Sequence, residues 1–105
     1  MYGPEYPIFS PNYLRCRVLP KLLNDKTPMF RYWSGIWRVS KNKRSTSRAV
    51  FYALYSIAHC FTVEASNGSF FCGDTKTTTD FEPHHWIQMG YYIGEALHEL
   101  VKMEI

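Results

Sequence analysis

The feature that most constrains the fold is the segment from residue 40 to residue 66, in which three kinds of sequence follow one another. Residues 40–48 form a basic loop rich in Lys, Arg, Ser and Thr. The apolar residues 48–57 predict a short buried helix, with a strand as the alternative. Residues 60–66 are rich in β-forming residues and alternate with a period of two, which places Glu64 on one face of a predicted strand.

Two charged residues frame the apolar part of this segment. Arg48 stands where the basic loop becomes apolar, and Glu64 follows inside the predicted strand. A carboxylate in a strand is costly to bury unless a cation, a metal-bound water or hydrogen-bond donors meet it. The two residues therefore indicate a functional site, and an ordinary internal ion pair is the alternative that the same spacing allows.

The N-terminal part predicts a strand end, a helix and short strands. Residues 1–12 contain three prolines among aromatic residues, which is typical of a strand end followed by an irregular turn. Apolar residues at helical spacing predict a helix over residues 12–25, with Pro20 in its first turn or at a kink. Residues 30–33 and 36–39 predict one or two short strands.

The C-terminal part predicts a loop and then a long amphipathic helix. Residues 66–80 are polar and contain glycines and a run of threonines, which is typical of a loop. Pro83 is expected to open the helix, where Gly90 and Gly94 would allow close approach to a sheet. Its apolar stripe has i, i+3 and i+4 spacing and consists of Trp86, Met89, Ile93, Ala96, Leu97, Leu100 and Val101.

The composition is that of a small globular protein. A chain of 105 residues makes one small domain, and its 46% hydrophobic and 17% aromatic residues exclude a disordered chain. Its three cysteines show no CxxC spacing, which favours free thiols in a reducing compartment. Neither a signal peptide nor an apolar run of membrane-spanning length is present, so we expect a cytoplasmic protein without a membrane partner.

The net charge of +3 is mild and fits an acidic partner or substrate. The basic loop carries much of this excess and could steer an acidic protein tail, although a run of charges is more often a solvated face. Its charged residues are not interleaved with aromatic residues, as a platform for stacking nucleic-acid bases requires. We therefore expect no nucleic-acid partner.

The histidines do not form a metal site that the sequence supports. His84 and His85 are adjacent at the start of a helix, so their side chains point in different directions. His98 begins an HExxH-like pattern, but Lys102 stands where the second histidine is required. The spacing of Glu95 and His98 is that of di-iron helical bundles, which need partners from other helices. We therefore assign no metal ligand to this chain and interpret these residues as helix-surface residues.

The whole segment from the basic loop to Glu64 resembles the cytosolic carboxypeptidase branch of the zinc metallocarboxypeptidases. Members of that branch carry a Lys-Ser-Lys-Glu-Gly-Thr-Gly-Arg-like loop, an apolar segment and then Tyr-Thr-Leu/Met-Glu. The short segment between Trp37 and Arg48 is most similar to members that trim side-chain polyglutamate from tubulin-like tails. In chain order, the similar segments are Met1–Gly3, Val18–Leu23, Lys41–Arg48, Cys60–Ala65, Phe81–Pro83 and Met89–Gly90.

The resemblance implies an α/β fold, specifically the C-terminal portion of a three-layer α/β/α metallocarboxypeptidase fold with a mixed sheet. Residues 1–105 would be the C-terminal part of a zinc carboxypeptidase catalytic domain. In the family, zinc is bound by a His-x-x-Glu pair and a later His, all of which would lie upstream of this chain. The arginines and asparagine that bind the substrate's terminal carboxylate would also lie upstream.

The resemblance also assigns roles to four residues. Glu64 matches the general base that deprotonates zinc-bound water, with a structural strand carboxylate as the alternative. Arg48 matches the arginine that pairs with the substrate's glutamate side chain, with a solvated loop arginine as the alternative. Lys43 and Thr46 match further substrate-binding positions of the loop. The chain departs from the family pattern at Arg44, which replaces a Glu, and at two serines that replace glycines.

Two functions follow as expectations. The first is a hydrolase: part of a cytoplasmic zinc metallocarboxypeptidase, a protease that removes glutamates from acidic tails such as polyglutamylated tubulin. Such deglutamylation would associate it with microtubules or cilia, and this chain alone is expected to be inactive for lack of zinc ligands. The second is a non-catalytic fragment or pseudoenzyme that binds acidic tails through its basic loop, because a catalytic carboxylate without zinc does not activate water.

Overall fold

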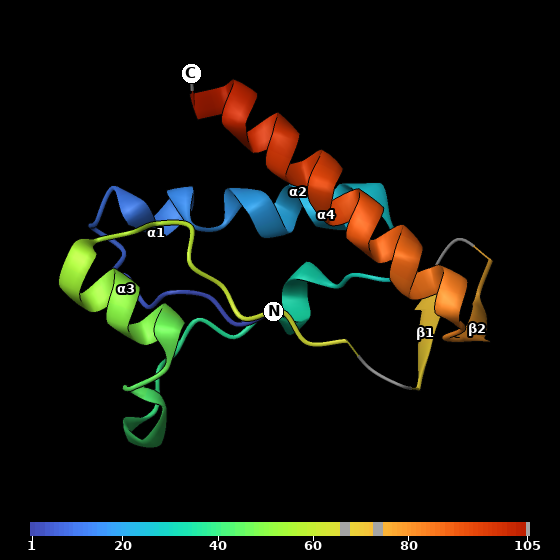
Figure 1. The fold of residues 1–105 in the computed structure, drawn as a ribbon, viewed down its shortest axis with the longest axis horizontal. Helices are drawn as coiled ribbons and strands as arrows, with labels where there is room; N and C mark the ends of the chain where they lie inside the picture. The colour runs from blue at the N-terminus through green and yellow to red at the C-terminus, as the bar shows by residue number, and fades with distance from the viewer. Residues whose placement is uncertain (66–67, 73–74, 105) are drawn as a thin grey trace. The chain divides into compact units, whose positions relative to one another are not determined.

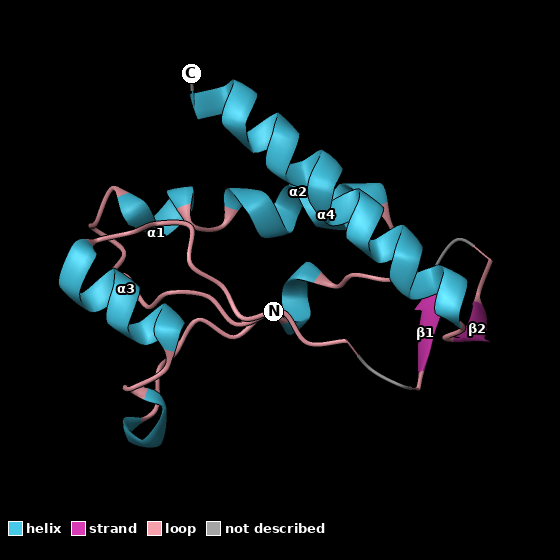
Figure 2. Cartoon of the chain, in the orientation of Figure 1, coloured by secondary structure: helices cyan, strands magenta, loops and turns pink. Residues whose placement is uncertain are grey.

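The computed structural model describes residues 1–65, 68–72 and 75–104, which combine helices with a two-stranded antiparallel sheet (Figures 1 and 2). This agrees with the α/β class in general. The chain divides into two compact units, the first made of Met1–Val18 and Trp33–Val63 and the second of Leu19–Tyr32 and Glu64–Ile105. The elements are α1 (Asn12–Arg15), α2 (Val18–Lys26), the 3-10 helices η1 (Tyr32–Ser34) and η2 (Lys41–Lys43), α3 (Ser47–Tyr55), β1 (Ser69–Cys72), β2 (Thr77–Asp80) and α4 (Pro83–Glu104).

The predicted helix over residues 12–25 is divided into α1 and α2. Pro20 lies in the first turn of α2, as expected, and the interruption falls at residues 16–17. In a continuous helix the nitrogen of Pro20 would face the carbonyl of Cys16, but proline has no N–H and its ring clashes with that carbonyl. The proline therefore starts a second helix instead of continuing the first.

Backbone pairings join three segments of the first unit at Tyr2. Tyr2 forms an antiparallel bridge with Thr62, in which N–H···O distances are 2.8 and 2.9 Å, and a parallel bridge with Ile36. Pro4 lacks the N–H that the next antiparallel pair, opposite Cys60, would need. The strands predicted at residues 36–39 and 60–66 are therefore wrong within the described residues, where each is reduced to a single bridge, and Ser66 lies outside those residues.

The predicted helix after the basic loop is confirmed as α3, although it spans Ser47–Tyr55. Ser56 ends it in the left-handed conformation (φ 53°), and its N–H bonds to the carbonyl of Tyr52 at 3.2 Å. The helix is less buried than predicted: Ala49 is buried, but 70% of Leu54 is exposed. The apolar run thus predicts the helix correctly but not its burial.

The second unit contains a β-hairpin where the sequence predicted a loop. β1 pairs antiparallel with β2, with Ser69 opposite Asp80 and Cys72 opposite Thr77. The rings of Phe70 and Phe81 lie 5.0 Å apart, and His85 is 5.3 Å from Phe70. This aromatic contact holds β1 against the start of α4, and the β-branched threonines of β2 favour a strand, so the polar composition was misleading.

The long C-terminal helix is confirmed as α4, opened by Pro83. Ala96 and Leu100 of the predicted stripe are buried, with 0% and 6% of their surface exposed. A Cβ at Gly90 or Gly94 would meet no atom within 4 Å, so the expected close approach to a sheet is absent among the described residues. In the described part of the chain, no helix has the length and apolar character required to cross a membrane.

Candidate functional site

Arg48 is buried at the start of α3, with 6% of its surface exposed. Its Nη1 donates a hydrogen bond of 2.8 Å to the carbonyl oxygen of Gly3. The guanidinium carbon lies 5.4 Å from the centroid of the Tyr2 ring, within the range of a cation–π interaction. The alternative of a solvated loop arginine is therefore wrong.

The carbonyl that accepts this hydrogen bond belongs to a tightly held segment. The N–H of Gly3 donates to the carbonyl of Ile36 at 2.8 Å. The Trp37 indole packs directly on Gly3, where a Cβ would overlap the ring. The Arg17 guanidinium lies 4.4 Å from the centroid of that same indole. The segment whose carbonyl accepts the Arg48 hydrogen bond is thus held by residues 36–37, and Trp37 in turn contacts Arg17.

Among the described residues, the hydrogen-bond and ring partners of Arg48 carry no charge, although the Glu5 carboxylate acts on the neighbouring Tyr52. The Cys60 thiol lies 3.5 Å from the Arg48 backbone carbonyl, and burial raises the pKa of that thiol, although Arg48 opposes the shift. Burial also raises the pKa of Tyr52, with a contribution from Glu5. None of the ion pairs formed between described residues includes Arg48. A buried guanidinium with only neutral partners is unfavourable without an anion, because its lost hydration is only partly replaced.

The remaining loop candidates lie beside Arg48 in sequence, at η2 and the start of α3 (Figure 1). Lys43 is exposed, while Thr46 is the residue before α3 and donates its hydroxyl proton to the carbonyl of Lys43 at 2.7 Å. Because that proton is in use, the Thr46 hydroxyl can only accept a hydrogen bond from a ligand in this conformation. Lys41 and Arg44 are also exposed, so the basic loop offers three exposed cations next to one buried cation.

Glu64 is exposed and lies outside any strand. It belongs to the second unit, whereas Arg48, Lys43 and Thr46 belong to the first. The sequence predicted Glu64 inside a strand, where a buried carboxylate would need a cation, a metal-bound water or hydrogen-bond donors. Exposure to water removes that requirement, because the carboxylate keeps its hydration.

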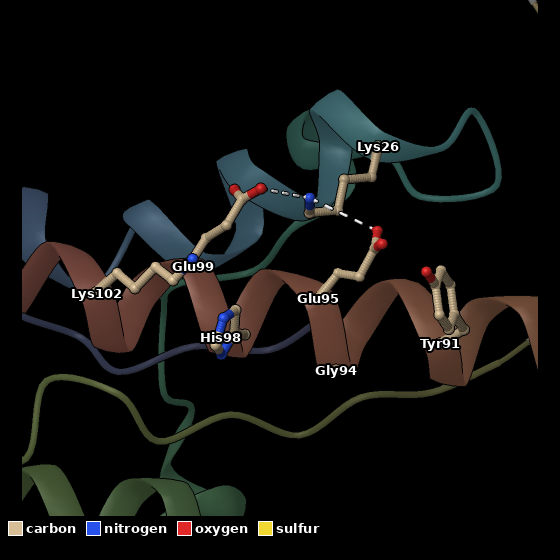
Figure 3. Close-up of a pocket in the computed structure, with 7 residues that line it drawn as sticks. All are labelled: Lys26, Tyr91, Gly94, Glu95, His98, Glu99 and Lys102. Carbon is tan, nitrogen blue, oxygen red and sulfur yellow. Dashed lines mark hydrogen bonds and ion pairs between the residues drawn. The ribbon is translucent and has the colours of Figure 1, made fainter.

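A pocket in the second unit was not predicted from the sequence (Figure 3). Lys26 of α2 donates to Glu99 of α4 at 2.7 Å and lies 3.7 Å from Glu95. The hydrogen bond to Glu99 raises the pKa of Lys26, and a hydrogen bond to Glu95 raises the pKa of Tyr91. The cavity has a volume of about 490 Å³ and is lined by Lys26, Tyr91, Gly94, Glu95, His98, Glu99 and Lys102.

The charges in this pocket largely compensate one another. Lys26 pairs with the carboxylates of Glu95 and Glu99, which a helical spacing of four residues places on the same side of α4, and Lys102 adds a second positive charge to the lining. The Glu95–His98 spacing was visible in the sequence, but Lys26 lies 73 positions from Glu99 and only folding brings the two together. We interpret the cluster as an exposed ion-pair network that joins α2 to α4.

The described residues do not fit a zinc site. Among residues 1–65, 68–72 and 75–104, no group of three or more His, Cys, Asp or Glu side chains could hold a metal ion. Any zinc required by the sequence resemblance would therefore need ligands from outside this set of residues. No chemical step of this chain is assigned to the metal.

Comparisons with protein families, with curated proteins and with solved structures find no match to this chain. The resemblance to the cytosolic carboxypeptidases therefore rests on the sequence motifs alone.

Proposed function

We propose that this chain is the C-terminal part of the catalytic domain of a cytosolic zinc carboxypeptidase that removes glutamates from acidic protein tails. Its own contribution would be to bind the side-chain carboxylate of a glutamate at Arg48. The complete domain would have the three-layer α/β/α architecture with a mixed sheet, and this chain would supply its last strands and helices.

The observation that carries the proposal is the buried guanidinium of Arg48, held by the Gly3 carbonyl and the Tyr2 ring. One of its five N–H donors is used by Gly3, and the planar guanidinium can present two others to a carboxylate in parallel. Since its present partners are neutral, a carboxylate would provide the missing opposite charge. The approach of a ligand requires movement of the atoms that cover Arg48.

The exposed cations of the basic loop complement this arrangement. Lys43 and its neighbours would attract an acidic tail over a range of about 8–10 Å at physiological salt, before Arg48 binds one carboxylate. A long-range attraction and a short-range bidentate contact have different dependences on salt. The proposal therefore predicts salt-sensitive association of the tail and a salt-resistant contribution of Arg48.

Large apolar side chains are exposed in both units, which supports the proposal that this chain is part of a larger domain. Phe9, Leu54 and Ile87 expose 87%, 70% and 75% of their surface. Apolar surface of this kind in a soluble protein is typical of a face that another element or partner covers. The parts of the domain that the resemblance places upstream would cover it.

Glu64 remains the proposed general base of the complete enzyme by its match to the family motif. Its exposure leaves the carboxylate accessible to water. The zinc of that enzyme would be bound by residues upstream, so the proposal requires that the same reading frame encode a His-x-x-Glu pair and a later His before Met1.

A non-catalytic protein that binds acidic tails is the second candidate, and the exposed Lys41, Lys43 and Arg44 favour it. It needs the same contact between the basic loop and the tail but no zinc and no general base. The two candidates therefore agree on binding and differ in glutamate release.

The test is to measure binding of a fluorescent hexaglutamate peptide to the 105-residue chain and to two variants that each lose one positive charge. Arg48→Gln should weaken binding about 10- to 100-fold, the value of a charge-assisted hydrogen-bonded pair. Arg38→Gln, which removes an exposed charge outside the basic loop, should weaken it less than about threefold. Circular dichroism of each variant reports whether the fold is retained.

Equal losses in the two variants would show that binding depends only on net charge and would overturn the role of Arg48. The catalytic half is tested with the protein expressed together with its upstream sequence and zinc. Glutamate release that is abolished by Glu64→Gln, with peptide binding retained, supports the enzyme. Peptide binding without glutamate release in the unmodified protein supports the second candidate.

A further inference from the structure

Two serine hydroxyls of the basic loop are exposed and available. Ser45 and Ser47 are exposed, and neither side chain takes part in the hydrogen bonds formed between described residues. In contrast, the hydroxyl of Ser40 bonds to Asn42 at 2.6 Å and that of Thr46 bonds to the Lys43 carbonyl at 2.7 Å. The loop thus presents two serine hydroxyls that form no side-chain hydrogen bond with the described residues.

The charges around these serines distinguish one from the other. Arg44 stands three positions before Ser47, Lys43 stands one position earlier, and both are exposed. Protein kinases select substrates by charge pattern, and one large class prefers a basic residue at this distance before the acceptor hydroxyl. Ser45 has the neutral Asn42 at the corresponding position. Of the two serines, the pattern therefore favours Ser47. Thr46 also has a basic residue, Lys43, at this distance, but its hydroxyl proton is bonded to the Lys43 carbonyl.

The local structure gives a kinase access to Ser47. Ser47 is the first residue of α3, and the side chain of Thr46 does not cap the helix. The first helical hydrogen bond in this turn is that of Val50 N–H to the Thr46 carbonyl, at 3.0 Å. Helix ends of this kind open readily, which allows residues 45–47 to become extended in a kinase cleft.

We propose that Ser47 is a phosphorylation site that controls tail binding by the basic loop. A kinase would transfer the γ-phosphoryl group of ATP to the Ser47 oxygen, with formation of the O–P bond and departure of ADP. The hydroxyl proton passes to the catalytic carboxylate of the kinase. This regulation rests on the proposed function, whereas the modification itself does not.

The phosphate would be stabilised where it forms. The N–H groups of the first turn of α3 have no intrahelical partners, and a dianion at that position is favoured by the helix dipole. The exposed side chains of Lys43 and Arg44 lie within the same short segment and can pair with the phosphate. These pairings withdraw the loop's cations from an acidic tail, and the added negative charge repels its carboxylates.

The test is to incubate the full chain with ATP and the catalytic subunit of a kinase that prefers basic substrates, and to locate phosphate by mass spectrometry. We expect phosphate on Ser47, none there in Ser47→Ala, and unchanged incorporation in the matched control Ser45→Ala. Arg44→Gln should slow incorporation at least about tenfold. Incorporation only at other positions, or none while a reference peptide is phosphorylated, would overturn the site.

Binding of hexaglutamate before and after the kinase reaction tests the regulation. We expect phosphorylated chain to bind at least about tenfold more weakly, and kinase-treated Ser47→Ala to keep the affinity of the unmodified chain. Phosphate on Ser47 without a change in affinity would overturn the regulatory role. If the unmodified chain does not bind hexaglutamate, the proposed function and the regulation fail together, and mass spectrometry still decides the modification site.

Discussion

Replacement of Gly3 with alanine should destabilise the first unit, because the new methyl group would occupy the space of the Trp37 indole. A Cβ built on Gly3 overlaps Cε3 and Cζ3 of that ring and lies 3.2 Å from Cη2. The indole cannot withdraw freely, since it also contacts Arg17 at 4.4 Å and Phe61 at 6.3 Å between centroids. The main-chain conformation of Gly3 is not the cause, because its φ is not positive.

Overpacking of this kind lowers the free energy of unfolding by about 1–3 kcal/mol. Alanine also reduces the conformational entropy of the unfolded chain, which raises the free energy of unfolding by about 0.4–1 kcal/mol. With the middle value of each range, the net loss in the free energy of unfolding should be about 1.3 kcal/mol, or a fall in melting temperature of about 5–10 °C. Gly90→Ala is the matched control. Its Cβ meets no atom within 4 Å, and alanine is the better helix former, so it should stabilise the chain by up to about 1 kcal/mol.

Urea denaturation followed by tryptophan fluorescence and circular dichroism gives both values. A Gly3→Ala variant as stable as the unsubstituted chain would refute the packing of Trp37 on Gly3. A Trp37→Leu substitution in the Gly3→Ala background provides a second check, since the two changes should be less destabilising together than their sum. The Gly3→Ala variant should also bind hexaglutamate more weakly, because the carbonyl that holds Arg48 is displaced.

Three further predictions concern other parts of the chain. The hydrogen bond to Glu99 raises the pKa of Lys26, so the stability that this bond contributes is fully present below the ordinary lysine pKa and disappears as the pH rises through the raised value. The free energies of unfolding of Lys26→Met and of the parent chain, measured by urea denaturation, should therefore converge at high pH. Burial raises the pKa of the Cys60 thiol, so alkylation followed by mass spectrometry at pH 8 should be at least about tenfold slower in the folded than in the unfolded chain. Phe70→Ala should lower the free energy of unfolding by about 1–2 kcal/mol through loss of ring contacts, whereas the half-exposed Phe71→Thr should change it by less than about 0.5 kcal/mol.

The sequence predicted those elements whose signals are local. α4 follows from an apolar stripe of helical period and an opening proline, and both are properties of consecutive residues. The position of α3 after the basic loop was predicted on the same basis, and the effect of Pro20 on α2 depends on four neighbouring residues. Local backbone chemistry decides each of these features before any distant segment makes contact.

Strands and sites were not predictable in the same way. Tyr2 pairs with Thr62, sixty positions away, and Pro4 limits that pairing to a single bridge, so the β-rich composition of the described residues 60–65 was insufficient to make a strand. The polar residues 66–80 contain a hairpin because Phe70 meets Phe81 and His85, a contact that exists only after folding.

The same distinction holds for the candidate site. Residue identity alone singled out Arg48, Lys43, Thr46 and Glu64, because a motif is a pattern of neighbouring residues. Only the tertiary structure decided that Arg48 is buried against the Gly3 carbonyl, since that contact joins residues 45 positions apart. Burial depends on the surroundings that folding assembles, and no local sequence pattern contains it. The need of a buried cation for an opposite charge follows from that burial.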